Sequence, residues 1–275
     1  MNNSLIIQNT DMDEYRKMSG LSKHQFDWFC QSPAYYQWRK TQDFKASKEM
    51  ILGTLIHAEA LEGRVEYAVG PQVDRRTKIG KEAWEAFCLD NIGKEVVNED
   101  DAARIKGAVS SAKQLLKQLD YEPEHDLGKL WVEAALFWED ESFPGVQFKG
   151  RPDLIIPHPS GDPDQLTTIV DLKTTTDFFR FTSKFWQFGY NKQAAWYQWG
   201  LRQIGYSKTR FIFAVVDTEA PFYGQLMRLG KHDESVTWER LAHSLRYFVE
   251  CNDRNDWPEP HTQGIKVIGH ELGLD

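Results

Sequence analysis

The chain has 275 residues, 41% apolar and 13% aromatic, which is enough for one large core. It has no long apolar run and no basic N-terminal region followed by an apolar stretch, so we expect a soluble, cytoplasmic protein that spans no membrane. The three cysteines, Cys30, Cys88 and Cys251, are too far apart for a four-thiolate cluster or a disulfide framework. The formal charge of -8 excludes a protein coated with positive charge, but it allows an enzyme with a local basic channel.

The first part of the chain, to about residue 125, is predicted to be mostly helical. Its first ten residues are expected to be frayed. Ser22 is positioned to cap a helix that ends before Pro33. A second helix contains His57 and closes at Gly63, and residues 101–119 form a clear amphipathic helix.

The pattern changes to β-type at residue 129, and the sheet core is expected to extend to residue 229. Three β-type runs separated by turn-like segments predict an antiparallel meander: 129–140, 146–157 and 165–173. A helix follows at 191–205, and a continuous apolar strand at 209–217 should lie parallel to the third run. A further strand near 223–229 and a C-terminal helix from about 236 to 250, followed by a tail, complete the chain.

The turn between the second and third β-type runs brings two carboxylates together. A hairpin centred on Gly161 to Pro163 places Asp153 opposite Asp171. Because side chains alternate along a strand, Lys173 shares a face with Asp171, while Leu172 points into the core. These residues form either a common cross-strand salt bridge or a site for a hard cation such as Mg²⁺, with the Leu172 carbonyl as a further ligand.

Two helices supply further candidates. Gln193 and Tyr197 share a helix face that should cover the sheet just past Lys173. The glutamine is either a site residue or a helix-edge residue bonded to water. His57 is either a satisfied core histidine or an imidazole ligand to the cation.

Taken in order, four motifs resemble the PD-(D/E)xK nuclease superfamily in its RecB-like branch: Gly53-x-x-x-His57, Gly150-Arg151-Pro152-Asp153, Asp171-Leu172-Lys173 and Gln193-x-x-x-Tyr197. The segments "LSKHQFDWFCQSP" and "VDRRTKIGKEAWEAF" look closest to the nuclease domain of exonuclease VIII, of the RecE family. The resemblance implies one α/β domain over residues 1–275, with a restriction-endonuclease-like core. In it, a central mixed β-sheet is flanked by helices, and the helical N-terminal part supplies His57.

Carried over by position, the resemblance makes His57, Asp153, Asp171 and the Leu172 carbonyl ligands for Mg²⁺, with Mn²⁺ as a substitute. It makes Lys173 the catalytic lysine. Gln193 and Tyr197 become supporting residues of the same site. Asp171 stands where glutamate is frequent in the superfamily, and its shorter side chain should still reach a metal.

Glu133, in the first β-type run, matches an acidic position of the family less closely. It is either a supporting or second-metal ligand, or an ordinary exposed strand residue.

The segment from Asp74 to Lys81 carries four basic residues and one acidic residue in an acidic chain. It is either a solvated loop or part of a DNA track that holds phosphates. With Arg151 of the motif, the DNA-binding candidates are Arg75, Arg76, Lys78, Lys81 and Arg151.

The function implied is metal-dependent 5′-to-3′ digestion of linear double-stranded DNA, leaving 3′ single-strand overhangs. The same resemblance implies a ring-shaped homo-oligomer and a single-strand annealing protein as partner, in a bacterial or phage-infected cell. Two rivals fit the same residues. One is an endonuclease on the same core, and the other is a non-catalytic DNA-binding or assembly subunit.

Overall fold

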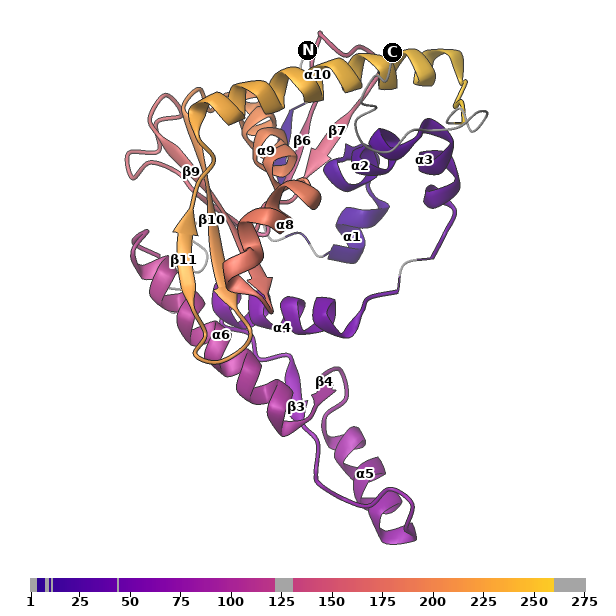
Figure 1. Cartoon of the computed structure of the whole chain (residues 1–275), viewed down its shortest axis with the longest axis vertical. Helices are drawn as coiled ribbons and strands as arrows, with labels where there is room; N and C mark the ends of the chain where they lie inside the picture. Colours follow the sequence, from indigo (N-terminus) through magenta and orange to yellow (C-terminus); the bar gives the residue numbers. More distant parts are fainter. Residues whose placement is uncertain (1–3, 8–9, 11, 44, 122–130, 260–275) are drawn as a thin grey trace, which may run out of the picture.

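A computed structural model of the chain describes residues 4–7, 10, 12–43, 45–121 and 131–259. In this part the chain forms mixed β-sheets flanked by helices. A narrow arm, residues 67–97, projects from the body (Figure 1). The expected α/β fold class is therefore confirmed. No helix in these ranges is long and apolar enough to cross a lipid bilayer.

The helices are α1 (Met12–Lys17), α2 (Lys23–Gln31), α3 (Pro33–Lys40), α4 (Lys48–Glu62), α5 (Lys78–Asp90), α6 (Glu99–Lys117), α8 (Phe181–Gln187), α9 (Tyr190–Ile204) and α10 (Lys231–Arg254), with a 3₁₀ turn at Phe178–Arg180. Their ends follow the expected signals. Ser22 caps α2 in a capping box with Gln25, and Gly63 closes α4 with a φ of 69°. Pro33 follows the end of α2, as expected, and is also the first residue of α3, whose N-cap is Ser32.

The strands are β1 (Leu5–Ile7), β2 (Leu21–Ser22), β3 (Tyr67–Val69), β4 (Glu95–Val97), β5 (Trp131–Val132), β6 (Ala135–Trp138), β7 (Phe148–Gly150), β8 (Leu154–Ile156), β9 (Thr167–Thr175), β10 (Thr209–Asp217) and β11 (Gly224–Met227). They form a five-stranded sheet in the order β11-β10-β9-β8-β5 and a four-stranded sheet in the order β1-β6-β7-β2. Strands β3 and β4 pair separately, at the base of the arm (Figure 1).

The expected meander is wrong in one respect, because the first two β-type runs each break into two strands. Strands β5 and β8 belong to the larger sheet, and β6 and β7 belong to the other. The two runs still share one antiparallel register, which is bent where Glu133 takes a positive φ of 51° and Pro152 offers no N–H donor. The bend turns one hairpin into a link between two sheets.

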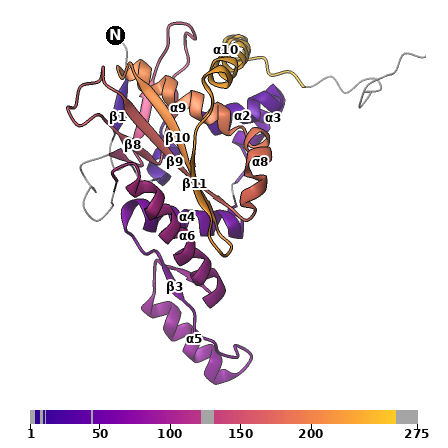
Figure 2. The same ribbon diagram turned by 60° about the vertical axis from the view of Figure 1, so that its left-hand side comes forward.

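The register around β9 agrees with the prediction. Leu154 lies opposite Val170 in the antiparallel pair β8–β9, and β9 runs parallel to β10. Helix α9 covers one face of this sheet, with α10 packed behind it, and α4 and α6 cover the other (Figure 2). Ile169 belongs to the aromatic-rich core under α9, whereas Leu172 belongs to the aliphatic core under α4 and α6.

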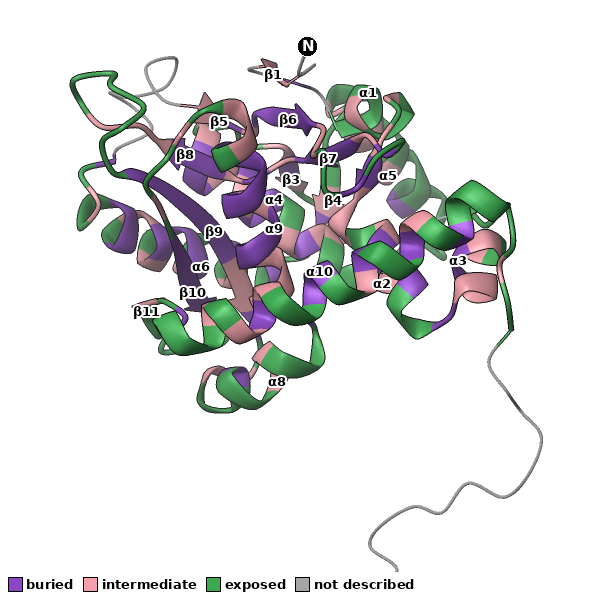
Figure 3. Ribbon diagram, turned by 90° about the horizontal axis from the view of Figure 1, so that it is seen from above, coloured by how far each residue is buried: buried purple, intermediate pink, exposed green. Residues whose placement is uncertain are grey.

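Both described ends of the chain are tied to the body. Leu5–Ile7, expected to be frayed, pairs with β6 as β1, because these three apolar residues extend the edge of the four-stranded sheet. At the other end α10 is longer than predicted, and its outer turns are exposed while the strands beneath are buried (Figure 3). Beyond α10, Trp257 packs on Tyr36 and Phe248. Most of the predicted tail, 260–275, lies outside the described residues.

Helix α9 approaches the four-stranded sheet closely at Gly200. A Cβ there would lie 2.7 Å from Cζ3 of the fully buried Trp138. Gly200→Ala is therefore expected to lower the free energy of unfolding by about 1–3 kcal/mol through overpacking. This loss outweighs the gain of about 1 kcal/mol in helix propensity. Urea unfolding monitored by circular dichroism measures the change.

The control is a double-mutant cycle with Trp138→Leu, which removes the ring that the added methyl group would meet. The loss from Gly200→Ala should shrink in that background. A Gly200→Ala protein as stable as the parent would contradict the close packing.

Candidate active site

The predicted carboxylate pair lies at the centre of the larger sheet. Because Leu154 pairs with Val170, the preceding Asp153 faces Asp171 across the strands. The Asp171 carboxylate is buried, and Lys173, two residues on along the same face, places Nζ 2.5 Å from its Oδ2. The strand alternation expected from the sequence is thus confirmed.

Helix α9 supports this pair from above. Gln193 Nε2 donates a hydrogen bond to Asp171 Oδ1 at 2.8 Å, so the glutamine is a site residue rather than a water-bonded edge residue. Tyr197, one turn further on along the same helix face, stacks on Phe211. A Cβ on Gly150 would lie 2.9 Å from the Tyr197 ring, which explains why the GRPD motif begins with glycine.

Helix α4 brings His57 to the same place. Its Nδ1 lies 3.4 Å from Asp153 Oδ2, and the same oxygen accepts a hydrogen bond of 2.7 Å from the Leu172 N–H. The helix comes close because Gly53 carries no side chain, since a Cβ there would lie 3.3 Å from Thr174 Oγ1. The glycine of the Gly53-x-x-x-His57 motif therefore sets the approach that the histidine needs.

Glu133 completes the cluster. One ligand atom from each of His57, Glu133 and Asp153 lies within 4.8 Å of the other two. Glu133 reaches this position from the bend between the sheets, where its own N–H donates to the Asp153 carbonyl at 2.9 Å. Its side chain is 15% exposed, so Glu133 is not an ordinary exposed strand residue.

The charges of this cluster favour a cation. Burial and the neighbouring Asp153 carboxylate raise the pKa of Glu133 to about 8. Burial likewise raises the pKa of Asp171 to about 6 and that of Asp153 above its usual range. For His57, burial and the charge of Lys173 lower the pKa to about 4, so its imidazole is neutral near pH 7. Two carboxylates and a neutral imidazole at this spacing are a donor set that fits a divalent metal.

Lys173 remains positively charged in this setting. Burial alone would lower the pKa of its ammonium group, but the carboxylates of Asp171 and Asp153 outweigh burial and raise the pKa. Its Nζ also lies 4.7 Å from the centre of the Tyr190 ring, a cation–π contact that no sequence pattern indicated. The ammonium group is therefore held between a carboxylate and an aromatic face.

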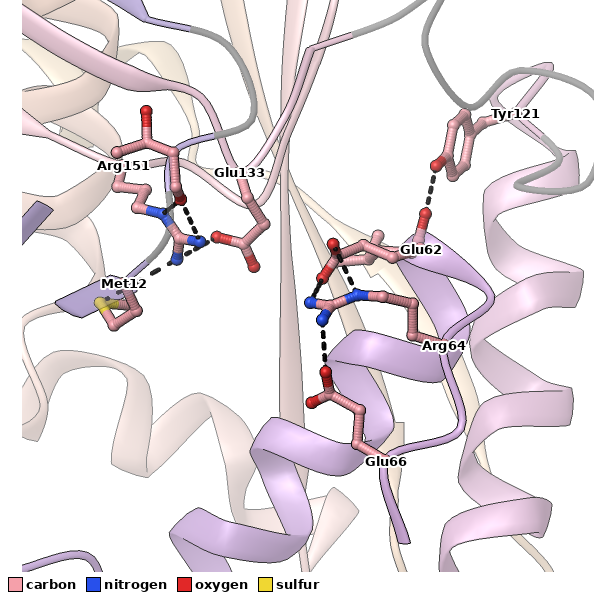
Figure 4. Close-up of polar contacts among 9 residues, drawn as sticks. Met12, Glu62, Arg64, Glu66, Tyr121, Glu133 and Arg151 are labelled. Carbon is pink, nitrogen blue, oxygen red and sulfur yellow. Dashed lines mark hydrogen bonds and ion pairs between the residues drawn. The ribbon is translucent and has the colours of Figure 1, made fainter. Parts of the chain in front are cut away.

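The basic candidates for DNA binding are not gathered at this site. Arg151 turns inward, with its side chain 12% exposed, and pairs with Glu133 at 2.5 Å while donating to the Thr10 carbonyl (Figure 4). The remaining four lie on the arm, which projects away from the sheet that carries Lys173 (Figure 1): Arg75, Arg76, Lys78 and Lys81.

The arm residues have local partners. Arg75 lies over the ring of Trp84, 4.2 Å from its centre, and Arg76 pairs with Asp74 at 3.0 Å. Both Arg76 and Lys78 have largely exposed side chains. The arm thus exposes basic side chains at a distance from the carboxylate cluster, and Arg76 and Lys78 each have an acidic neighbour, Asp74 or Glu82.

Sequence reasoning overlooked a second charged group beside the site. Lys23 of α2 and Lys192 of α9 both pair with Asp27, at 2.6 and 2.7 Å. Lys23 and Asp27 lie one turn apart on α2, but Lys192 lies far along the chain and matches no motif, so only the packing of α2 against α9 adds the second lysine. A usable signal was the nearby run Phe178–Phe188, which holds six aromatic residues and two basic ones but no acid.

Comparisons with known proteins agree with this geometry. Residues 22–266 match the family described as "PDDEXK-like domain of unknown function (DUF3799)". The fold resembles the crystal structure of a protein from Eubacterium rectale described as a "Putative exonuclease", with a TM-score of 0.54 and 13% sequence identity over 95% of this chain and 96% of that one. At this identity the likeness concerns the fold alone. No curated protein sequence matches the chain.

Metal binding is expected to strengthen as the pH rises from about 6 to about 8. In the metal-free protein the raised pKa values keep a proton on Asp171 up to about pH 6 and on Glu133 up to about pH 8. Each proton that the metal must displace lowers the apparent affinity by up to about tenfold per pH unit below that pKa. Calorimetric titration with Mn²⁺ in buffers of different ionisation heat measures the affinity and the protons released.

Glu133→Gln is the control, because it removes the group that titrates near pH 8. The variant should bind Mn²⁺ with a flatter dependence between pH 7 and 8. Equal affinity of the parent protein at pH 6 and pH 8 would mean that these carboxyls do not hold the metal.

Proposed function

The chain belongs to the PDDEXK-like family DUF3799, and from this premise we propose that it is a Mg²⁺-dependent exodeoxyribonuclease of the RecE-like kind. It digests linear double-stranded DNA from the 5′ end and leaves 3′ single-strand overhangs for homologous recombination. One observation carries the proposal: Lys173 is ion-paired with Asp171 directly beside the cluster of Asp153, His57 and Glu133.

The metal would be held by His57, Asp153, Asp171 and the Leu172 carbonyl, with Glu133 as a supporting ligand. A divalent ion there supplies Lewis acidity toward phosphate oxygens and lowers the pKa of bound water. Leu172 fits a backbone role because its N–H already orients the Asp153 carboxylate. This arrangement leaves Arg151 to hold Glu133 in place rather than to grip DNA.

Lys173 acts on the reacting phosphate. Its ammonium group is charged and partly exposed, so it can orient the attacking water and offset the negative charge that develops on the phosphate oxygens. Gln193 is a positioning residue, since its hydrogen bond fixes the Asp171 carboxylate. Tyr197 packs on Phe211 and Gly150, which fixes the helix face that also carries Gln193.

The resemblance to RecE-like nucleases carries two further proposals, a ring-shaped homo-oligomer and a single-strand annealing protein as partner. The arm supports the first of these. It exposes the large apolar side chains of Ile79, Leu89 and Ile92, as protein surfaces that bind another subunit do.

A digestion assay tests the activity. The substrate is linear duplex labelled at either the 5′ or the 3′ end, with a closed circle beside it, in Mg²⁺ and in EDTA. We expect Mg²⁺-dependent early release of the 5′ label and an intact circle. Lys173→Ala should lower the rate by about 100-fold or more while keeping metal binding. Asp153→Ala and Asp171→Ala should abolish turnover through loss of the metal.

Lys184→Ala, a lysine of α8 outside the cluster, is the matched control and should digest DNA at the parent rate. Cleavage of the closed circle would show that the protein is an endonuclease on the same fold and not an exonuclease. If neither substrate is cleaved with any metal, the protein is a non-catalytic DNA-binding subunit. A near-normal rate in Lys173→Ala would overturn the role given to this lysine.

The arm is expected to contribute phosphate contacts. Arg76→Ala and Lys78→Ala should each weaken duplex binding and reduce the slope of log K against log salt by about 0.9. Fluorescence anisotropy over a series of NaCl concentrations measures both quantities. Lys208→Ala, which changes an exposed lysine immediately before β10, is the control. An unchanged slope in the arm variants would mean that this segment does not contact DNA phosphates.

A further inference from the structure

A cavity of about 1110 Å³ opens beside the candidate active site, and most of its wall takes no part in the proposed chemistry. Lys173, Gln193 and Tyr197 line part of it, so it is continuous with the site. Helix α2 and the residues that join α8 to α9 supply other parts of its wall. Of the charged residues in its lining, seven are basic and only Asp27 is acidic. Two of the seven, Arg151 and Lys173, are offset by Glu133 and Asp171 outside the lining, and the remaining excess of basic residues suits a polyanion that also reaches Lys173.

Exposed aromatic rings form part of the lining. Trp186 and Phe188 both line the cavity, and each is 52% exposed, so their ring faces are open to a ligand. They are linked to the site through other rings, since Phe188 lies 5.8 Å from Tyr190, whose ring contacts the Lys173 ammonium group. Flat, solvent-facing rings among basic groups are suited to stack on nucleobases.

A preformed pair of lysines lies beside these rings. Lys23 and Lys192 share the single carboxylate of Asp27, so the three side chains carry one excess positive charge when both ammonium groups are protonated. Gly189 makes this possible, because it takes a φ of 65° and a Cβ there would lie 2.8 Å from Cε of Lys192. Burial lowers the pKa of Lys23, and the Asp27 carboxylate opposes this. Lys23 also approaches the Phe188 carbonyl, at 3.5 Å, which joins the lysine pair to the aromatic wall. Ammonium groups held in this way can bind backbone phosphates.

We propose that this cavity binds an unpaired segment of the DNA strand being cut. Trp186 and Phe188 stack on its bases, and Lys23 and Lys192 bind its phosphates. Bases inside a duplex are already stacked on one another, so rings in the wall can reach only bases that have left the helix. The inference rests on the proposed function for the identity of the strand, and it adds that the end must open before it reaches Lys173.

The test measures binding in EDTA, without cleavage, by fluorescence anisotropy. The probes are a 3′-labelled 15-nucleotide oligothymidylate and a blunt duplex whose end base pairs are cross-linked so that they cannot open. Trp186→Ala and Phe188→Ala should each weaken oligothymidylate binding by about 5- to 100-fold. Lys192→Ala should weaken it and flatten its salt dependence by about 0.7 in slope. Binding to the cross-linked duplex should not change.

Two matched variants separate stacking from general damage. Trp186→Phe keeps a flat ring and should restore most of the oligothymidylate affinity. Trp38→Ala removes a tryptophan of similar exposure, 55%, that does not line the cavity, and should leave binding unchanged. The midpoint of thermal unfolding should be the same in all of them, because the mutated rings are half exposed.

Oligothymidylate binding that is unchanged in Trp186→Ala and Phe188→Ala would overturn the proposal, and so would an equal loss on the cross-linked duplex. This readout does not depend on catalysis. A protein that digests no DNA but shows the ring-dependent binding would refute the proposed nuclease and keep the strand site. A protein that digests DNA, but whose oligothymidylate binding does not depend on Trp186 and Phe188, would support the proposed nuclease and refute the strand site.

Discussion

The structure depends on holding three carboxylates, Glu133, Asp153 and Asp171, in one poorly solvated place. Such groups repel one another and lose hydration, which is why their pKa values are raised. No single strand or helix could hold them against this repulsion, so each is fixed by a different part of the backbone. Asp171 lies within β9, Asp153 immediately before β8, and Glu133 at the bend between the two sheets.

The surrounding fold provides this restraint through close contacts at glycines. Gly53 lets α4 approach Thr174, which brings His57 to Asp153. Gly150 lets Tyr197 pack against the sheet, which aligns α9 so that Gln193 meets Asp171. The glycines in the motifs are thus packing residues, and the polar members of the motifs depend on the approach that they permit.

Much of this arrangement follows from the sequence, because alternation and turn chemistry are local. The turn near Gly161 fixes the register of β8 and β9, and with it the pairing of Asp153 and Asp171. No signal in the sequence predicts the bend at Glu133, because a positive φ at a non-glycine residue is imposed by tertiary packing. The inward turn of Arg151 could not be foreseen for the same reason, because its partner Glu133 is placed by that bend. The resemblance to a nuclease family favoured His57 as a ligand, whereas its place in the helix left it either a core histidine or a ligand.

Charge balance connects the carboxylates to the cavity beside them. When all three are ionised, Arg151 and Lys173 offset two of the negative charges and leave one. In the metal-free protein, burial and this excess negative charge together raise the pKa of Glu133 to about 8, so that it holds a proton near neutral pH. A divalent cation would reverse the excess to a single positive charge, which one phosphodiester would neutralise. The lysine pair at Asp27 carries a similar single excess charge next to this position. Successive phosphates of one strand would then meet successive sites of matching charge, which favours a strand that lies along the cavity with its cut phosphate at Lys173.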